Sequence, residues 1–204
     1  MPLLDFFRRR RPIRDGKALA DFIDENAAFL VQKGIYEYSR ARAGHSSKVL
    51  FAEPEFKSAV EASRWRAYPL GLAMVGEIAE GVLASLDPTD RLARLPALTA
   101  LVLSVFDRYP VSPDVGLDAW RALRADLERH MQSLGLHPPK RAMDVPEPFA
   151  KAYFTNMPID KKLRAPDAPS ITSYLRVSVC NIHDELTKRL DRAALPDLLR
   201  MPVA

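Results

Sequence analysis

The sequence predicts an all-α fold, a single irregular bundle of about six to eight helices, several of them kinked or broken at proline. Three observations lead to this prediction. Apolar residues recur at every third or fourth position through most of the chain, proline and glycine separate these runs, and no convincing stretch alternates apolar with polar residues as a strand does. The 204 residues, 48% of them apolar and 27% charged, suit one globular domain with a sizeable core.

The first helical pattern covers residues 17–43. Asp15 precedes it in the position of an N-cap, and apolar side chains from Leu19 to Val31 share one face. Gly34 interrupts the pattern, so the segment is predicted to form either one long helix or two helices in tandem.

Prolines and glycines delimit the central helices. A helix from residue 54 is predicted to kink or break at Pro69, because proline lacks the N–H of a helical hydrogen bond. Further helices are predicted at residues 70–86 and 89–109, and another ends at Gly135.

The pattern changes at residue 138, where proline becomes frequent. Only a short helix, at about residues 147–155, is predicted before a long irregular connection at 156–169. Connections of this length are often functional, so this one is a candidate partner-contacting loop. A final helix is predicted after Ser170.

Positive charge is concentrated at the N-terminus. The chain holds 30 Lys and Arg residues against 26 Asp and Glu, a net charge of +4, and residues 1–14 hold five arginines against one aspartate, also +4. The remainder is formally neutral. We expect a basic amphipathic arm at 1–14 and a single helical domain at 15–204, and the neutral domain argues against specific nucleic-acid binding.

The arm combines apolar and cationic side chains in the stretch LLDFFRRRRPIR. Such a segment suits an anionic membrane surface, where each arginine contributes about 1 kcal/mol and the apolar side chains enter the interface. It suits an acidic protein groove or RNA equally well, and the alternative is a solvated tail whose apolar residues fold back on the domain. The predicted partner or membrane contacts are Phe6, Phe7, Arg8, Arg9, Arg10 and Arg11.

The sequence contains no recognisable catalytic set. Cys180 is the only cysteine, no Gly-rich phosphate loop is present, and the four histidines lack metal-binding spacing. The GHS of AGHSSKVL resembles part of a nucleophile elbow, but a helical pattern leads into it instead of a strand, so Ser46 is interpreted as a helix cap. We therefore expect no cofactor and no metal, and the balance favours a protein without enzymatic activity.

Glu77 and Glu80 stand out because they share one helix face in otherwise apolar sequence. A carboxylate buried without a partner is costly, so the pair is exposed, paired with arginine, or part of a site. Together with His183 on the last helix, they are the candidate residues of an apolar-ligand pocket. Aromatic residues at helical spacing are expected in the core; they include Phe22, Phe29, Trp65, Phe106 and Trp120.

The FFRRRR start, the helical pattern and the stretch SLGLHPPKRAMDVPEPFAKAYF resemble the bacterial ubiquinol–cytochrome c chaperone family. In that family a helical domain attends the assembly of a membrane complex. The resemblance implies a helical assembly factor and carries no residue roles over to this chain.

We therefore expect a non-enzymatic helical protein that binds another protein as an assembly factor or adaptor, peripheral to a membrane through its arginine-rich arm. The cysteine content makes the cytoplasm the default location, with the inner membrane as the peripheral site. The alternative is a helical pocket protein or small enzyme that binds an apolar ligand between its central helices. The sequence leaves the partner and the oligomeric state open.

Overall fold

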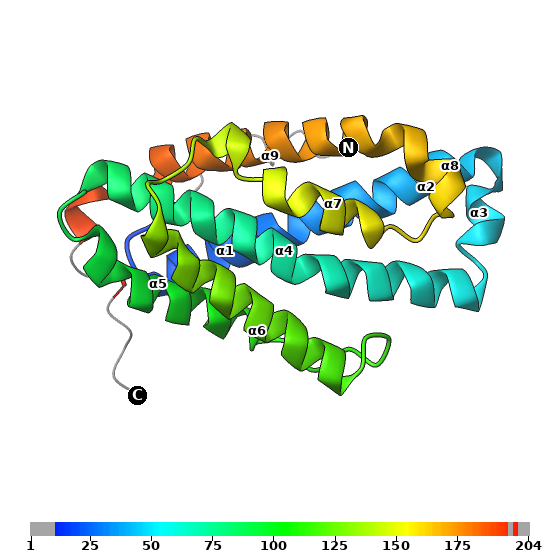
Figure 1. The fold of residues 1–204 in the computed structure, drawn as a ribbon, viewed down its shortest axis with the longest axis horizontal. Coiled ribbons are helices and arrows are strands. Elements are labelled where there is room, and N and C mark those ends of the chain that lie inside the picture. Colours follow the sequence, from blue (N-terminus) through cyan, green and yellow to red (C-terminus); the bar gives the residue numbers. More distant parts are fainter. Residues whose placement is uncertain (1–10, 196–197, 200–204) are drawn as a thin grey trace.

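The computed structural model describes residues 11–195 and 198–199, and it confirms the predicted all-α fold. The described residues form one helical bundle without strands (Figure 1). The longer helices are α1 (Gly16–Val31), α4 (Pro54–Leu86), α5 (Arg91–Phe106), α6 (Leu117–Ser133), α7 (Glu147–Thr155) and α9 (Ala168–Arg189). Shorter helical turns connect them.

Helix α1 is followed directly by further helical turns. These are a π-helical turn at Gln32–Glu37, α2 (Tyr38–Ala43), a 3₁₀ turn at Gly44–Ser46 and α3 (Ser47–Leu50). Asp15 caps α1 as predicted, and its side chain accepts a hydrogen bond from the Ala18 N–H at 2.7 Å. The segment predicted at 17–43 is therefore two helices joined by a π-helical turn.

Helix α4 is the central element and packs against α1, α5, α6 and α9. Its second half, from Ala67 to Ala84, is almost entirely buried. Pro69 lies inside the helix, so the separate helix predicted at 70–86 is instead the continuation of α4. A proline removes one backbone hydrogen bond, and we attribute the continuity to apolar burial on both sides of Pro69, which offsets that loss.

Among the described residues, α4 is the one helix that is long and apolar enough to cross a membrane by length and composition. However, 78% of its most apolar window is buried inside the bundle. A core helix of this length passes the same test, and here the neighbouring helices cover the apolar surface.

The proline-rich region is more helical than predicted. Helix α7 occupies 147–155 as expected, but the connection at 156–169 contains α8 (Lys161–Arg164) and a 3₁₀ turn, and α9 already begins at Ala168. Arg164 is buried and donates hydrogen bonds to the carbonyls of Met157 and Thr155. These bonds hold the connection against α7.

The last residues of the predicted arm pack against the end of α9. Ile13 is fully buried, its N–H donates to the Arg189 carbonyl at 2.8 Å, and its own carbonyl accepts from the Asp191 N–H at 3.0 Å. Arg14 forms an ion pair with Asp191. The predicted boundary after residue 14 therefore falls within a segment that is joined to the bundle.

Most of the predicted aromatic core lies inside the bundle. Phe22, Phe106 and Trp120 are buried, and Trp65 is partly buried with its ring centroid 5.6 Å from that of Trp120. Phe29 was wrongly assigned to the core, since it is 49% exposed. It lies seven residues after Phe22 and about 20° further from the centre of the apolar stripe, at the solvent edge of α1.

Candidate functional site

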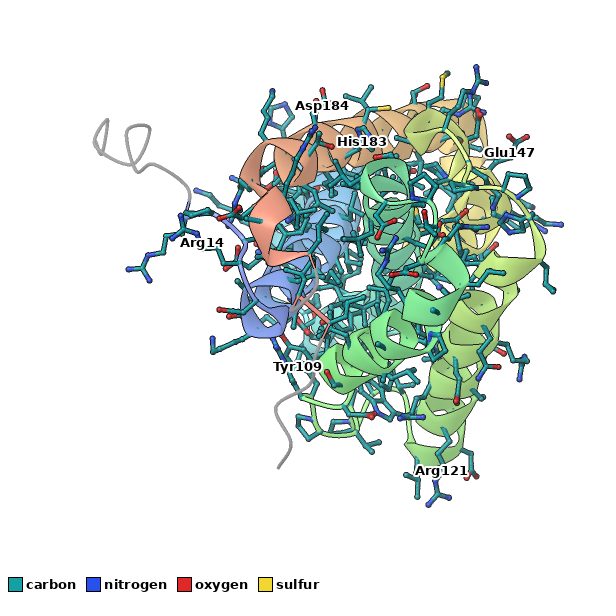
Figure 2. The ribbon with its side chains drawn as sticks, turned by 90° about the vertical axis from the view of Figure 1, so that its left-hand side faces the viewer. Arg14, Tyr109, Arg121, Glu147, His183 and Asp184 are labelled. Carbon is teal, nitrogen blue, oxygen red and sulfur yellow. The ribbon has the colours of Figure 1, made fainter. Side chains whose placement is uncertain are left out.

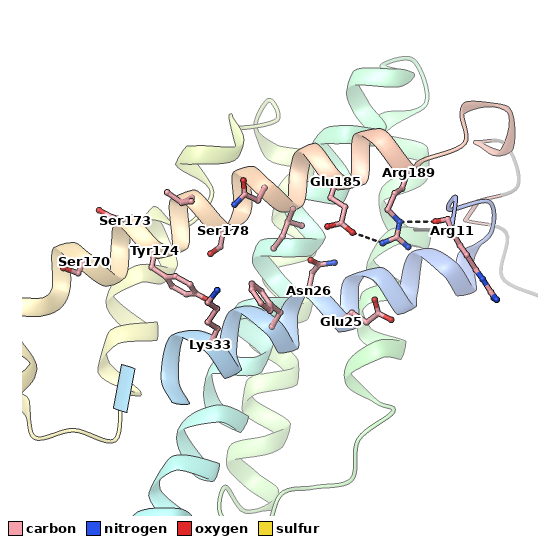
Figure 3. Close-up of a pocket in the computed structure, with 14 residues that line it drawn as sticks. Arg11, Glu25, Asn26, Lys33, Ser170, Ser173, Tyr174, Ser178, Glu185 and Arg189 are labelled. Atoms are coloured by element: carbon pink, nitrogen blue, oxygen red, sulfur yellow. Dashed lines mark hydrogen bonds and ion pairs between the residues drawn. The ribbon is translucent and has the colours of Figure 1, made fainter. Parts of the chain in front are cut away.

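An open groove of about 1020 Å³ lies between α1 and α9 (Figure 3). Phe29 of α1 is exposed on one side and Val177 of α9, which is 62% exposed, on the other. Ile182 contributes to the buried floor. Exposed apolar side chains that share a concave surface are typical of a binding site.

Arg189 on α9 makes contacts that fix one end of the groove. Its Nε donates to the Arg11 carbonyl at 3.1 Å, and its Nη1 donates to Glu185 at 2.9 Å. The guanidinium also lies over the ring of Phe22, 5.3 Å from the ring centroid. Together with the backbone pairing of Ile13, these contacts fix the start of α1 against the end of α9.

The opposite end is fixed by the carbonyl of Leu30, which accepts hydrogen bonds from two tyrosines. Tyr153 of α7 donates at 2.7 Å and Tyr174 of α9 at 3.2 Å. The carbonyl lies just before the π-helical turn, where the backbone register changes from i−4 to i−5. Burial raises the pKa of Tyr153 and raises that of Tyr174 to about 12, so both hydroxyls remain donors at neutral pH.

Gly34 makes room for these two tyrosines. A Cβ atom at this position would overlap the hydroxyl of Tyr153 and would lie 2.9 Å from Cε1 of Tyr174. Gly34 is itself buried, so the rings have little space to move away. Gly34, which interrupts the helical pattern in the sequence, is therefore required for close packing at this end of the groove.

Opposite charges stand on either side of the apolar middle of the groove. Glu25 and Lys33 are both exposed on the α1 side, before and after Phe29. Lys33 Nζ lies 5.2 Å from the Phe29 ring centroid, and neither charge has an ion-pair partner within the described part of the chain. Eight residues of helix place the two charges about 12 Å apart. Along α1 the groove therefore presents an acidic position, the exposed ring of Phe29 and a basic position in that order from the Arg11 end, while Asn26, Ser178 and Asn181 add polar side chains to its lining.

Glu77 lies in the buried half of α4, where a histidine and a lysine reach it. It is 3% exposed, Nε2 of His130 lies 3.0 Å from its Oε2, and Nζ of Lys140 forms an ion pair with its Oε1 at 2.8 Å. Burial alone would raise the pKa of Glu77, but the contacts with His130 and Lys140 outweigh burial and hold it below its ordinary value of 4.5. The cluster joins α4 to α6 and to the segment that follows α6.

Glu80 is paired with an arginine, one of the three arrangements expected from the sequence. Arg91 donates from Nε to Glu80 at 2.5 Å, and it also donates to the carbonyls of Leu134 and His137 at 2.7 and 2.8 Å. The cavity beside this pair measures about 10 Å³, far below the volume of a small-molecule site. The geometry thus gives Glu80 a role in fastening the chain after α6.

His183 lies on the outer surface of α9 beside Asp184 (Figure 2). Its side chain is 40% exposed, and its Nδ1 lies 3.3 Å from a carboxylate oxygen of Asp184. The described contacts bring Glu77 and Glu80 to cations and do not bring His183 to either of them. Within the described residues, no group of three or more His, Cys, Asp or Glu side chains is placed to hold a metal ion.

The predicted arm contacts divide between described and undescribed positions. Phe6, Phe7, Arg8, Arg9 and Arg10 lie outside the described residues. Arg11 is described and exposed, and it lines the groove at the Arg189 end.

Sequence reasoning missed the groove residues Phe29, Lys33 and Val177. Val177 carried a weak signal, because it follows Leu175 by two residues and so lies off the buried stripe of α9. A single exposed valine is common on protein surfaces. The pairing of α1 with α9 is what makes these residues a site, and it does not follow from the pattern of either helix.

No family model, curated protein or solved structure matches the chain. The likeness to the ubiquinol–cytochrome c chaperone family therefore stays a resemblance, and the function is argued from the groove.

Proposed function

We propose that this protein is a non-enzymatic adaptor that binds an amphipathic helix of a partner protein in the groove between α1 and α9. The observation that carries this proposal is the exposure of Phe29 and Val177 on facing sides of one open groove. An amphipathic helix that lays its apolar face into such a groove is a recurrent mode of recognition.

The dimensions of the groove favour a helical segment. Its α9 side runs from Ser170 to Arg189, which is about 28 Å of helix. A partner helix of about nineteen residues covers that length. A drug-sized ligand would fill only part of so long and open a surface.

The charges of the groove specify the chemistry of the partner. A complementary partner places a basic side chain beside Glu25 and an acidic side chain beside Lys33, about 12 Å further along. Apolar side chains of the partner between these two charges would cover Phe29. These charges lie at the solvent edge, so they select orientation and register more than they add affinity.

The alternative function, an apolar-ligand pocket among the central helices, gains no support from the cavities. Glu77 is satisfied by His130 and Lys140, and the space beside Glu80 is about 10 Å³. The proposed cytoplasmic location, at an anionic surface of the inner membrane, rests on arm residues outside the described part of the chain and stays a prediction.

The test uses the full chain and a fluorescent amphipathic peptide of about nineteen residues, with leucines on one face and a lysine and a glutamate eight residues apart. We expect saturable binding by fluorescence anisotropy. Val177→Asp should weaken it at least tenfold, because a charge would be buried in the apolar middle. A peptide with glutamate at both charged positions should bind several-fold more weakly, since either orientation then places a carboxylate beside Glu25.

Val49→Asp is the matched control, because Val49 on α3 is 66% exposed and lies outside the groove. It should leave the peptide affinity unchanged. Equal affinities of Val177→Asp and Val49→Asp, or the absence of binding at any peptide concentration, would rule the proposal out.

A further inference from the structure

We propose that the chain's own N-terminal segment, residues 1–10, occupies the groove between α1 and α9 when no partner is bound. This inference rests on the proposed function, because it takes the groove as the binding site and adds an intramolecular competitor. It is carried by three features: the point at which the segment leaves the bundle, its reach, and the order of its charges.

The segment leaves the bundle at the mouth of the groove. Arg11 lines the groove, and its carbonyl is held by Nε of Arg189 at 3.1 Å. The next anchor, Ile13, is buried and hydrogen bonded at both its N–H and its carbonyl. Residue 10 is therefore bonded to a residue that already belongs to the site.

The reach of the segment matches the length of the groove. Ten extended residues span up to about 33 Å, whereas the α9 side is about 28 Å long. A short tether of this kind presents its own residues at an effective concentration on the order of millimolar. Even weak apolar contacts are then enough for the segment to occupy the groove in a substantial fraction of molecules.

The order of side chains in the segment complements the order in the groove. Moving away from Arg11, the segment presents the arginines of residues 8–10, then the phenylalanines of residues 6–7, then Asp5. Moving away from Arg11 along α1, the groove presents Glu25, then Asn26 and Phe29, then Lys33.

The spacing of these charges agrees as well. From Arg9 to Asp5 an extended chain covers about 13 Å, close to the roughly 12 Å that separates Glu25 from Lys33 on the helix. The phenylalanines at positions 6 and 7 then fall between the charges, opposite Phe29 and Val177. The same segment places basic, apolar and acidic groups where the proposed partner helix would place them.

The experiment uses the full chain carrying Pro2→Cys and Cys180→Ser, with a nitroxide label on the new cysteine. We expect paramagnetic broadening of amide signals near Lys33 and Val177 in the monomeric protein. Adding Val177→Asp should remove most of the broadening, and adding Val49→Asp should leave it. Broadening that is absent from the groove, or that Val177→Asp does not change, would overturn the proposal.

A second measurement separates this inference from the proposed function. In the full chain, Phe6→Asp with Phe7→Asp should raise the affinity for the amphipathic peptide roughly tenfold, because the competitor is weakened. An unchanged affinity for the peptide would rule out competition between the segment and the peptide for the groove. Label-induced broadening of the groove in a protein that binds no peptide even when it carries Phe6→Asp and Phe7→Asp would support the intramolecular contact and overturn the proposed function instead.

Discussion

Replacing Gly34 by alanine is expected to destabilise the bundle by about 1–5 kcal/mol, although alanine is the better helix former. The added methyl group would overlap the hydroxyl of Tyr153 and press on the ring of Tyr174. Displacing Tyr153 forfeits its buried hydrogen bond to the Leu30 carbonyl, at a cost of about 1–3 kcal/mol. Overpacking adds about 1–3 kcal/mol, and the higher helix propensity of alanine returns about 1 kcal/mol.

Urea unfolding followed by circular dichroism measures this cost as a change in the free energy of unfolding. Gly81→Ala is the matched control, since Gly81 lies within α4 and an added Cβ there would lie 4.0 Å from its nearest neighbour, Cβ of Pro139. It should be neutral or stabilising by up to about 1 kcal/mol.

A double-mutant cycle tests whether overlap with the Tyr153 hydroxyl causes the loss of stability in Gly34→Ala. Tyr153→Phe alone should cost about 1 kcal/mol, because Tyr174 still donates to the Leu30 carbonyl. Combined with Gly34→Ala it removes the overlapping oxygen, so the double variant should be at least about 1 kcal/mol more stable than the sum of the single effects. Strictly additive costs, or a Gly34→Ala protein as stable as the parent, would refute the packing argument.

Three further changes have definite expected outcomes. Glu77→Gln should lower stability by roughly 1–3 kcal/mol at neutral pH by removing the charge beside Lys140. Because the pKa of Glu77 is lowered in the folded protein, the stability difference between Glu77→Gln and the parent should shrink at pH values below 4.5, the ordinary pKa of this carboxyl group. Urea midpoints that differ equally at pH 7 and pH 3 would contradict this expectation. Arg164→Ala should make the connection at 156–167 the first site of limited proteolysis, since its anchoring hydrogen bonds are lost; identical digestion of variant and parent would show that they are dispensable. Flotation with anionic vesicles should recover less protein when residues 2–10 are deleted than when the chain is intact, and equal recovery would exclude a membrane role for the arm.

The helical class, the cap of α1 and the approximate helix positions were readable from the sequence because they depend on local spacing, whereas Ser46 precedes α3 without a side-chain capping hydrogen bond. Asp15 and the 147–155 helix are examples. The separate helix predicted after Pro69 was wrong, because the rule for proline considers only local backbone hydrogen bonding and not the burial that surrounds Pro69 in α4. The pairing of Glu80 with Arg91 was foreseeable from the cost of a buried carboxylate, and Arg91 was among the basic residues on the neighbouring helix.

The groove could not be predicted in the same way. Phe29 follows the helical period closely enough to pass for a core residue, and Val177 looks like an ordinary surface valine. Their significance depends on tertiary contacts between distant segments, and above all on Tyr174 reaching the Leu30 carbonyl. Periodicity within one helix contains no information about such pairings.

The hydrogen bond between Tyr174 and Leu30 joins residues 144 positions apart. On the ribosome, α1 emerges long before α9 is translated, so a nascent chain presents only one side of the groove and leaves Phe29 without its counterpart. A partner that must contact both sides of the groove therefore does not bind a chain whose synthesis is incomplete. On the proposed function, binding in this groove therefore requires that α9 has been translated.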